Sequence, residues 1–97
     1  DIEGELFAFY ILDDSMEDSA ILANDIIISS KKTDDIKSGD IVVALYKQKP
    51  IVRYYLEKDD YKGLISENMS YSPIELGDSV CIIGKVISVI RYLQNNS

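Results

Sequence analysis

The fold is decided by one stretch near the middle of the chain, IVVALYKQKPIVRYYL (41–56). Its two ends, 41–46 and 51–56, are rich in β-branched and aromatic residues, a composition typical of strands. A connection of four residues, 47–50, separates them and has the length of a hairpin loop. The stretch therefore predicts two antiparallel strands in the centre of the sequence.

Similar apolar runs flank this hairpin on both sides. They cover 6–12, 25–29, 63–66 and 80–92, and segments rich in polar residues, Gly or Pro separate them. Gly84 lies inside the last run, where a glycine typically marks a bulge or a kink. No window has the period of an amphipathic helix. We expect a mostly β domain, a small barrel or sandwich of about six short antiparallel strands with at most one short helical turn.

Composition limits what such a domain can do. The 97 residues suffice for a single domain, 1–97. The net charge of −7 and the lack of a basic stripe argue against direct binding to nucleic acid. There is no histidine, which excludes Ser-His-Asp and Cys-His catalysis and removes the commonest zinc ligand. We therefore expect neither a metal nor a cofactor.

The single cysteine, Cys81, cannot form a disulfide within the chain. This favours a reducing, cytoplasmic setting. No apolar run approaches the length needed to span a bilayer, so we expect no contact with a membrane.

Six short motifs follow one another in a fixed order. They are Asp14-Ser15-Met16 after Phe9, Asn24-Asp25 before 26–28, and the segments 38–44, 51–54, 68–74 and 83–86. This order resembles the C-terminal domain of LexA-like repressors. That family includes self-cleaving phage repressors and UmuD-type proteins and is related to signal peptidases. The resemblance runs from about Phe7 to Arg91, nearly the whole chain.

The resemblance implies a serine peptidase site with a Ser-Lys dyad that cuts the protein's own linker. The family's nucleophile falls on Ser15, and its base is a lysine in a Val-Lys-Arg context on a later strand. The resemblance also implies a homodimer that reaches operator DNA through an N-terminal helix-turn-helix domain, which this sequence does not include. A RecA-type co-protease in the SOS response is a further partner that the resemblance implies.

The position of the base departs from the family pattern. The segment Ile51-Val52-Arg53-Tyr54 aligns with the Val-Lys-Arg motif and puts Arg53 at the lysine. The base must be neutral to accept the serine proton, whereas a guanidinium stays protonated in proteins. Lys49, on the same strand, lies four residues away, about 13 Å along an extended chain. We therefore expect a peptidase site without activity.

Ser15 also has a plain structural interpretation. It opens Ser15-Met16-Glu17-Asp18, which has the spacing of a capping box, so its hydroxyl would cap one helical turn. Asn24 stands where the family has a glycine, and asparagine tolerates the left-handed backbone conformation. No Ala-Gly or Cys-Gly pair, the family's cleavage site, precedes Ser15 in this sequence.

Other motif residues have structural roles in our interpretation. We expect Met16 to fill the core. Asp25 and Asp40 should accept hydrogen bonds from backbone N–H groups in turns. Asn68 and Tyr71 should tie a loop to the sheet.

The last apolar run is long for a small sheet, and a long open strand edge invites pairing with another chain. The resemblance also places dimer contacts near the C-terminus. We predict a dimer interface formed by Val86, Ser88, Ile90 and Tyr92.

Three functions remain after these observations. The leading hypothesis is the C-terminal dimerisation and regulatory domain of a LexA-like or phage-type transcriptional repressor, with an inactive peptidase site. The first alternative is an active, self-cleaving Ser-Lys peptidase. The second is a peptide-binding relic that holds a partner's strand in the former substrate cleft.

Overall fold

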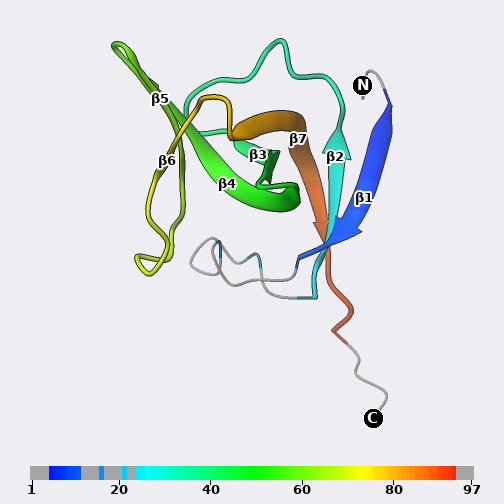
Figure 1. Ribbon diagram of the computed structural model, residues 1–97. Coiled ribbons are helices and arrows are strands. Elements are labelled where there is room, and N and C mark those ends of the chain that lie inside the picture. The colour runs from blue at the N-terminus through cyan, green and yellow to red at the C-terminus, as the bar shows by residue number, and fades with distance from the viewer. Residues whose placement is uncertain (1–4, 12–15, 17–20, 22–23, 94–97) are drawn as a thin grey trace.

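The computed structural model describes residues 5–11, 16, 21 and 24–93. All regular structure in this part of the chain is β, and seven strands form one antiparallel sheet in the order β1-β2-β7-β3-β4-β5-β6 (Figure 1). The strands are β1 Leu6–Tyr10, β2 Ile26–Ser30, β3 Ile41–Tyr46, β4 Lys49–Lys58, β5 Tyr61–Ile65, β6 Ile74–Glu75 and β7 Val80–Ile90. The mostly β prediction is confirmed. The structure adds β6, which the sequence interpretation placed in a loop, and the sheet stays open.

The central hairpin forms where the sequence predicts it. β3 pairs with β4 along its whole length. The turn contains Lys47 and Gln48, with φ angles of 51° and 68°. Two successive left-handed residues are typical of a type I′ turn, whose twist matches that of the flanking strands. The connection is therefore shorter than predicted, and Lys49 and Pro50 belong to β4.

β7 joins the two halves of the sheet. Residues 80–85 pair with β3, and residues 85–90 pair with β2. In Figure 1, β1, β2 and the end of β7 lie together on one side, and the β4–β5 hairpin projects from the other. Two bulges interrupt β7: one adds Ile83 opposite β3, and the other adds Ile87 opposite β2. The bulge predicted near Gly84 is confirmed.

Gly84 lies where three strands approach closely. A Cβ atom there would be 2.7 Å from the carbonyl oxygen of Ser30 and 2.8 Å from the ring of Phe7, and it would also overlap Ser29 Oγ. A side chain cannot occupy this space without moving the backbone of β2.

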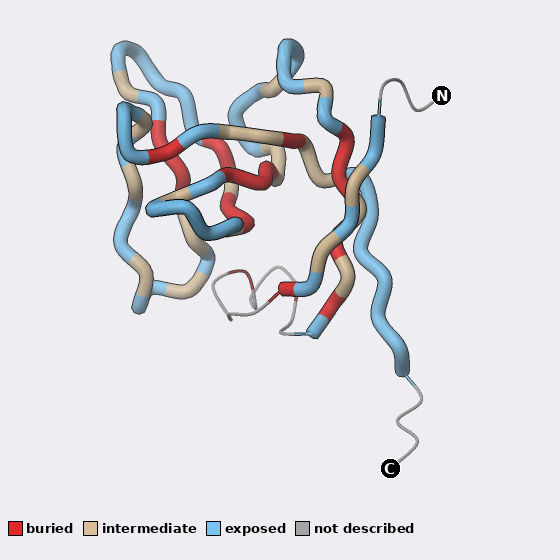
Figure 2. Tube along the Cα trace, turned by 45° about the vertical axis from the view of Figure 1, so that its right-hand side comes forward, coloured by how far each residue is buried: buried red, intermediate tan, exposed pale blue. Residues whose placement is uncertain are grey.

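Two apolar clusters lie on opposite faces of the sheet, because successive strand residues point to opposite sides. The first contains Ile11, Met16, Ile21, Ile27, Val43 and Val52. The second contains Val42, Ala44, Tyr55, Leu64 and Val80. Figure 2 shows the buried residues at the centre of the molecule and the exposed C-terminal end of β7. The core position predicted for Met16 is confirmed, with 1% of its surface exposed.

Within the described residues, the structure has no helix that could cross a membrane.

Candidate functional site

Ser15 and the helical turn predicted at 15–18 lie outside the described residues, apart from Met16. The structure does describe how the surrounding segment, 12–23, is attached to the sheet. Met16 and Ile21 are buried in the first apolar cluster. At the base of the segment, the Asn24 N–H donates to the Ile11 carbonyl, and the Ile11 N–H donates to the Asp25 carbonyl, both at 2.8 Å. We call Ile11, Asn24 and Asp25 the neck of the 12–23 segment.

Asn24 adopts the left-handed conformation that its place in the motif predicts, with φ of 74°. This angle explains why the family's glycine can be replaced by asparagine here, since asparagine reaches the left-handed region more readily than most residues.

Arg53 lies on β4 and is 5% exposed. Its Nη1 donates to the Val52 carbonyl at 2.8 Å. The guanidinium carbon lies 5.0 Å from the centre of the Tyr71 ring, within the range of a cation–π interaction. Because a guanidinium has five N–H donors and no acceptor, the position of the family's base offers hydrogen-bond donors and no group that can take a proton.

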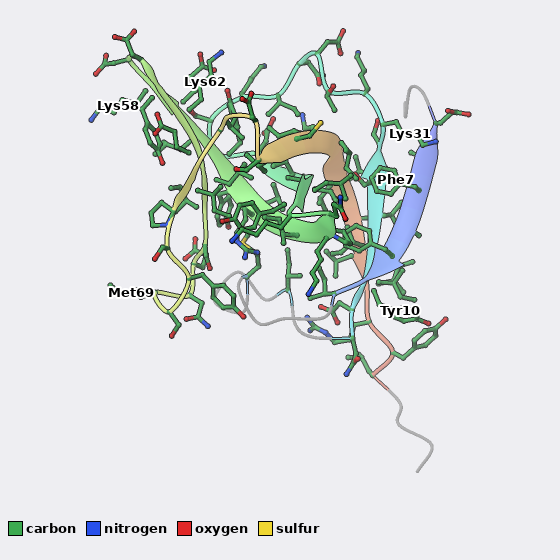
Figure 3. The ribbon with its side chains drawn as sticks, in the orientation of Figure 1. Phe7, Tyr10, Lys31, Lys58, Lys62 and Met69 are labelled. Carbon is green, nitrogen blue, oxygen red and sulfur yellow. The ribbon has the colours of Figure 1, made fainter. Side chains whose placement is uncertain are left out.

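The loop between β5 and β6 holds Tyr71 in place. Ser66 Oγ accepts a hydrogen bond from the Asn68 N–H at 2.9 Å, and Asn68 Oδ1 accepts one from the Ser70 N–H at 2.9 Å. The Tyr71 N–H donates to the Asn68 carbonyl at 3.0 Å. In Figure 3, Met69 marks the tip of this loop. Asn68 and Tyr71 thus have the structural roles expected of them, and Tyr71 also covers Arg53.

Lys85 shares a sheet face with Arg53. Arg53 lies opposite Val42, and Val42 lies opposite Lys85, so the backbones of the two basic residues are two strands, or about 10 Å, apart. Lys85 Nζ is 3.3 Å from Asp40 Oδ2. Through this ion pair, Lys85 stabilises the turn at 37–40.

Asp40 is the acceptor at the centre of that turn. Its Oδ2 accepts a hydrogen bond from the Lys37 N–H at 2.9 Å, while the Asp40 N–H donates to the Lys37 carbonyl at 2.9 Å. The hydrogen bond from the Lys37 backbone, followed by the interaction with Lys85, lowers the pKa of the Asp40 carboxyl. As expected, the Asp40 carboxylate accepts a hydrogen bond from a backbone N–H group.

Asp25 has a partner that the sequence interpretation did not identify. Arg91 Nε donates to Asp25 Oδ1, and Arg91 Nη2 donates to Asp25 Oδ2, both at 2.8 Å. The hydrogen bonds to Asp25 raise the pKa of Arg91. The expected role of Asp25, limited to backbone contacts in a turn, was therefore too narrow. One signal was available, because Asp25 and Arg91 are opposite charges within two mostly apolar runs.

The residues predicted for the dimer interface do not all share one face. Ser88 lies opposite Ile28 and Ile90 opposite Ile26, whereas Val86 lies opposite the buried Ser29. The bulge at Ile87 causes this reversal, and Val86 packs against the first apolar cluster.

The exposed end of β7 is apolar. Ile90 is 42% exposed and Tyr92 78%. Tyr10, opposite Ile26 on β1 and labelled in Figure 3, extends this surface and is 61% exposed. In the part of the chain that the structure describes, residues 86–90 pair with β2 on one edge, and no strand pairs with the other edge.

Two shallow hollows lie elsewhere on the surface. The first has a volume of about 400 Å³ and is lined by Phe7, Lys31, Thr33, Ile82 and Ile83; Figure 3 labels two of these, Phe7 and Lys31. The second, about 350 Å³, extends from Thr33 and Ile82 toward Glu57 and Lys62. Neither is lined by Arg53 or Tyr71.

A family model described as Peptidase S24-like matches residues 1–87. Similar proteins include the LexA repressor of Pseudarthrobacter chlorophenolicus, 40% identical over 91 residues, which are 94% of this chain and 36% of that protein. The LexA repressor of Thermobifida fusca is 37% identical over 89 residues, 92% of this chain and 34% of that protein. The LexA repressor of Caldicellulosiruptor saccharolyticus is 40% identical over 89 residues, 92% of this chain and 43% of that protein.

The chain spans 34–43% of the length of these three relatives. The family model, in contrast, covers nearly all of the chain, including the Ser15 and Arg53 positions. The chain therefore belongs to the Peptidase S24-like family.

Proposed function

We propose that this chain is the C-terminal dimerisation and regulatory domain of a LexA-like or phage-type transcriptional repressor, and that its peptidase site does not cleave. Membership of the Peptidase S24-like family and the similarity to LexA repressors support the first part. The single observation that carries the second part is Arg53, a buried side chain that stays protonated at the position of the family's base.

A domain of this kind acts by joining two copies of a repressor. Dimerisation fixes the distance between two DNA-binding heads, which must match the spacing of two operator half-sites. The acidic domain itself, with a net charge of −7, is unsuited to contact phosphates. In this proposal a separate N-terminal domain binds the operator, the protein acts in the cytoplasm, and a RecA-type partner is dispensable because no cleavage follows.

The chemistry explains why one substitution is sufficient to silence the site. A serine hydroxyl is a weak nucleophile until a base removes its proton. Loss of one member of a catalytic serine unit typically lowers the rate roughly 10⁴- to 10⁶-fold. An arginine near the serine would in addition donate a hydrogen bond to its oxygen and make that oxygen less nucleophilic.

The test is self-cleavage of the full-length repressor at alkaline pH, followed by intact mass. We expect no cleavage in the natural protein and none in Ser15→Ala. Cleavage of the natural protein that Ser15→Ala abolishes would show an active peptidase and overturn the second part of the proposal.

The converse variant is Arg53→Lys. It returns an ionisable amine to the position of the base, and we expect cleavage to become measurable at alkaline pH, where the neutral amine is more populated. Arg91→Lys is the matched control, because it makes the same replacement at the arginine bound to Asp25 and should not cleave.

A further inference from the structure

The first of the two surface hollows has the lining of a ligand site. Its volume is about 400 Å³, and its lining residues are Phe7, Lys31, Thr33, Ile82 and Ile83. This volume falls within the range of about 300–1,000 Å³ that is usual for small-molecule sites. Such sites combine apolar walls with a few polar groups that orient the ligand, and this hollow has both.

The apolar side chains of the hollow come from β1 and β7, which lie on either side of β2 in the sheet. We call Phe7, Ile82 and Ile83, all half-buried, the apolar wall. The Phe7 ring reaches across to Gly84, where a Cβ atom would lie 2.8 Å from Phe7 Cε1. The bulge in β7 adds Ile83 next to this glycine. The glycine and the bulge together leave apolar surface open beside the ring.

The polar groups of the hollow come from the loop that follows β2. Lys31 and Thr33 are both exposed, and Lys31 lies on the same side of the molecule as Phe7 (Figure 3). Among the described residues that line the hollow, Lys31 is the only charged one. In a chain with a net charge of −7, a positive charge beside an apolar wall favours an anion at this place. The Thr33 hydroxyl supplies a second hydrogen-bond donor.

The present ion pair of Lys31 is weak. Its Nζ lies 3.5 Å from Glu5 Oε1, and the two side chains are 54% and 81% exposed. Exposed pairs of this kind contribute little free energy, so the carboxylate of a ligand can replace that of Glu5 at small cost. A ligand tail that covers the apolar wall also excludes water from the new ion pair, which strengthens it.

We propose that the first hollow binds a small carboxylate with an apolar tail. The tail packs against the apolar wall, and the carboxylate accepts hydrogen bonds from Lys31 Nζ and Thr33 Oγ1. Neither Arg53 nor Tyr71 lines the hollow, so this site is separate from the position of the family's base and does not rest on the proposed function.

Titration of the full chain with sodium octanoate, followed by NMR of the backbone amides, tests the proposal. We expect saturable shifts of the amides of 31–33 and 82–83, with a dissociation constant of about 1 mM, because a shallow hollow covers only part of the ligand. Octylammonium chloride has the same tail and the opposite charge. An acidic chain attracts cations in general, so binding of octanoate at least about fivefold tighter is specific to the hollow.

The charge of Lys31 is tested by Lys31→Glu, a change at an exposed position. We expect this variant to bind octanoate at least about fivefold more weakly and octylammonium more tightly than the natural chain does. Lys58→Glu, on the distant β4–β5 hairpin (Figure 3), makes the same change in net charge and should keep the natural affinities. Glu5→Gln removes the competing carboxylate and should bind octanoate severalfold more tightly.

Three results would overturn the proposal. The first is the absence of saturable shifts at these amides with octanoate. The second is equal affinity of the natural chain and Lys31→Glu for octanoate, or an equal loss in Lys58→Glu. The third is a shift of the same amides with protein concentration alone, which would give the hollow to a second copy of the chain. We expect no such shift, because the proposed dimer surface lies at the other end of β7.

Discussion

At the residue scale, the proposed loss of peptidase activity rests on Arg53, the residue at the position of the family's base. The sequence predicts its position in the motif and the consequence for proton transfer. It does not predict the ring of Tyr71 at 5.0 Å or the bond to the Val52 carbonyl. The position of the ring depends on where the loop after β5 folds back, which no local pattern encodes. The same holds for Asp25 and Arg91, 66 residues apart in sequence.

The stacking of Tyr71 on Arg53 gives the first prediction. Tyr71→Leu keeps an apolar side chain and removes the ring face that the guanidinium contacts. We expect a loss of about 1–2 kcal/mol in the free energy of unfolding, the range of a desolvated cation–π interaction. Urea denaturation measures this. Tyr92→Leu, at a position 78% exposed, should change the free energy by less than about 0.5 kcal/mol.

Asp40 gives a prediction for acid stability. Its pKa in the folded state is below the ordinary value of 3.8, so the carboxylate stabilises the fold at pH values above the unfolded pKa. This contribution is lost as pH falls through the folded pKa. Asp40→Asn should therefore destabilise the protein by about 1 kcal/mol at pH 7, and the difference from the natural protein should shrink below pH 4.

Urea denaturation at pH 7 and at pH 3 measures the effect of Asp40→Asn. Asp60→Asn, at an exposed position in the β4–β5 turn, removes the same charge as a control. A difference between Asp40→Asn and the natural protein that is equal at both pH values would contradict the role given to the carboxylate.

At the element scale, the strands follow from the sequence, and the irregularities of β7 do so only in part. Apolar runs, most of them rich in β-branched or aromatic residues, predict six of the seven strands, because such side chains fill pleated, half-buried surfaces. Gly84 marks one bulge. The second, at Ile87, has no glycine and arises from the register of β2 against β7. It changes which predicted interface residues are exposed, so Val86 faces the core while Ser88 and Ile90 face outward.

The packing around Gly84 gives the third prediction. Gly84→Ala places a Cβ against the Ser30 carbonyl oxygen, 2.7 Å away, and a backbone atom cannot move aside as the end of a side chain can. We expect a loss of about 1–3 kcal/mol, the range for an overpacked site. Thermal unfolding measures it. Gly77→Ala, where a Cβ would meet no atom within 4 Å, should be neutral or slightly stabilising.

At the scale of the whole molecule, the open sheet presents an exposed surface at the end of β7. It combines Ser88, Ile90 and Tyr92 with Tyr10 from the edge strand β1. Exposed apolar side chains that gather on one surface mark interaction sites. We therefore keep Ser88, Ile90 and Tyr92 in the proposed dimer interface and remove Val86, which packs against the first apolar cluster.

Our central proposal is that this domain joins two repressor chains into a dimer and does not cleave the chain. A substitution at Ile90 tests the dimerisation most directly. Sedimentation velocity at tens of micromolar should show a dimer for the natural chain. Ile90→Asp, which puts a charge at the centre of the apolar surface, should sediment as a folded monomer. Leu56→Asp, at a hydrophobic position on β4 that is 36% exposed, should remain a dimer. A natural chain that is monomeric at this concentration, or an Ile90→Asp variant that dimerises as well as the natural chain, would contradict the account.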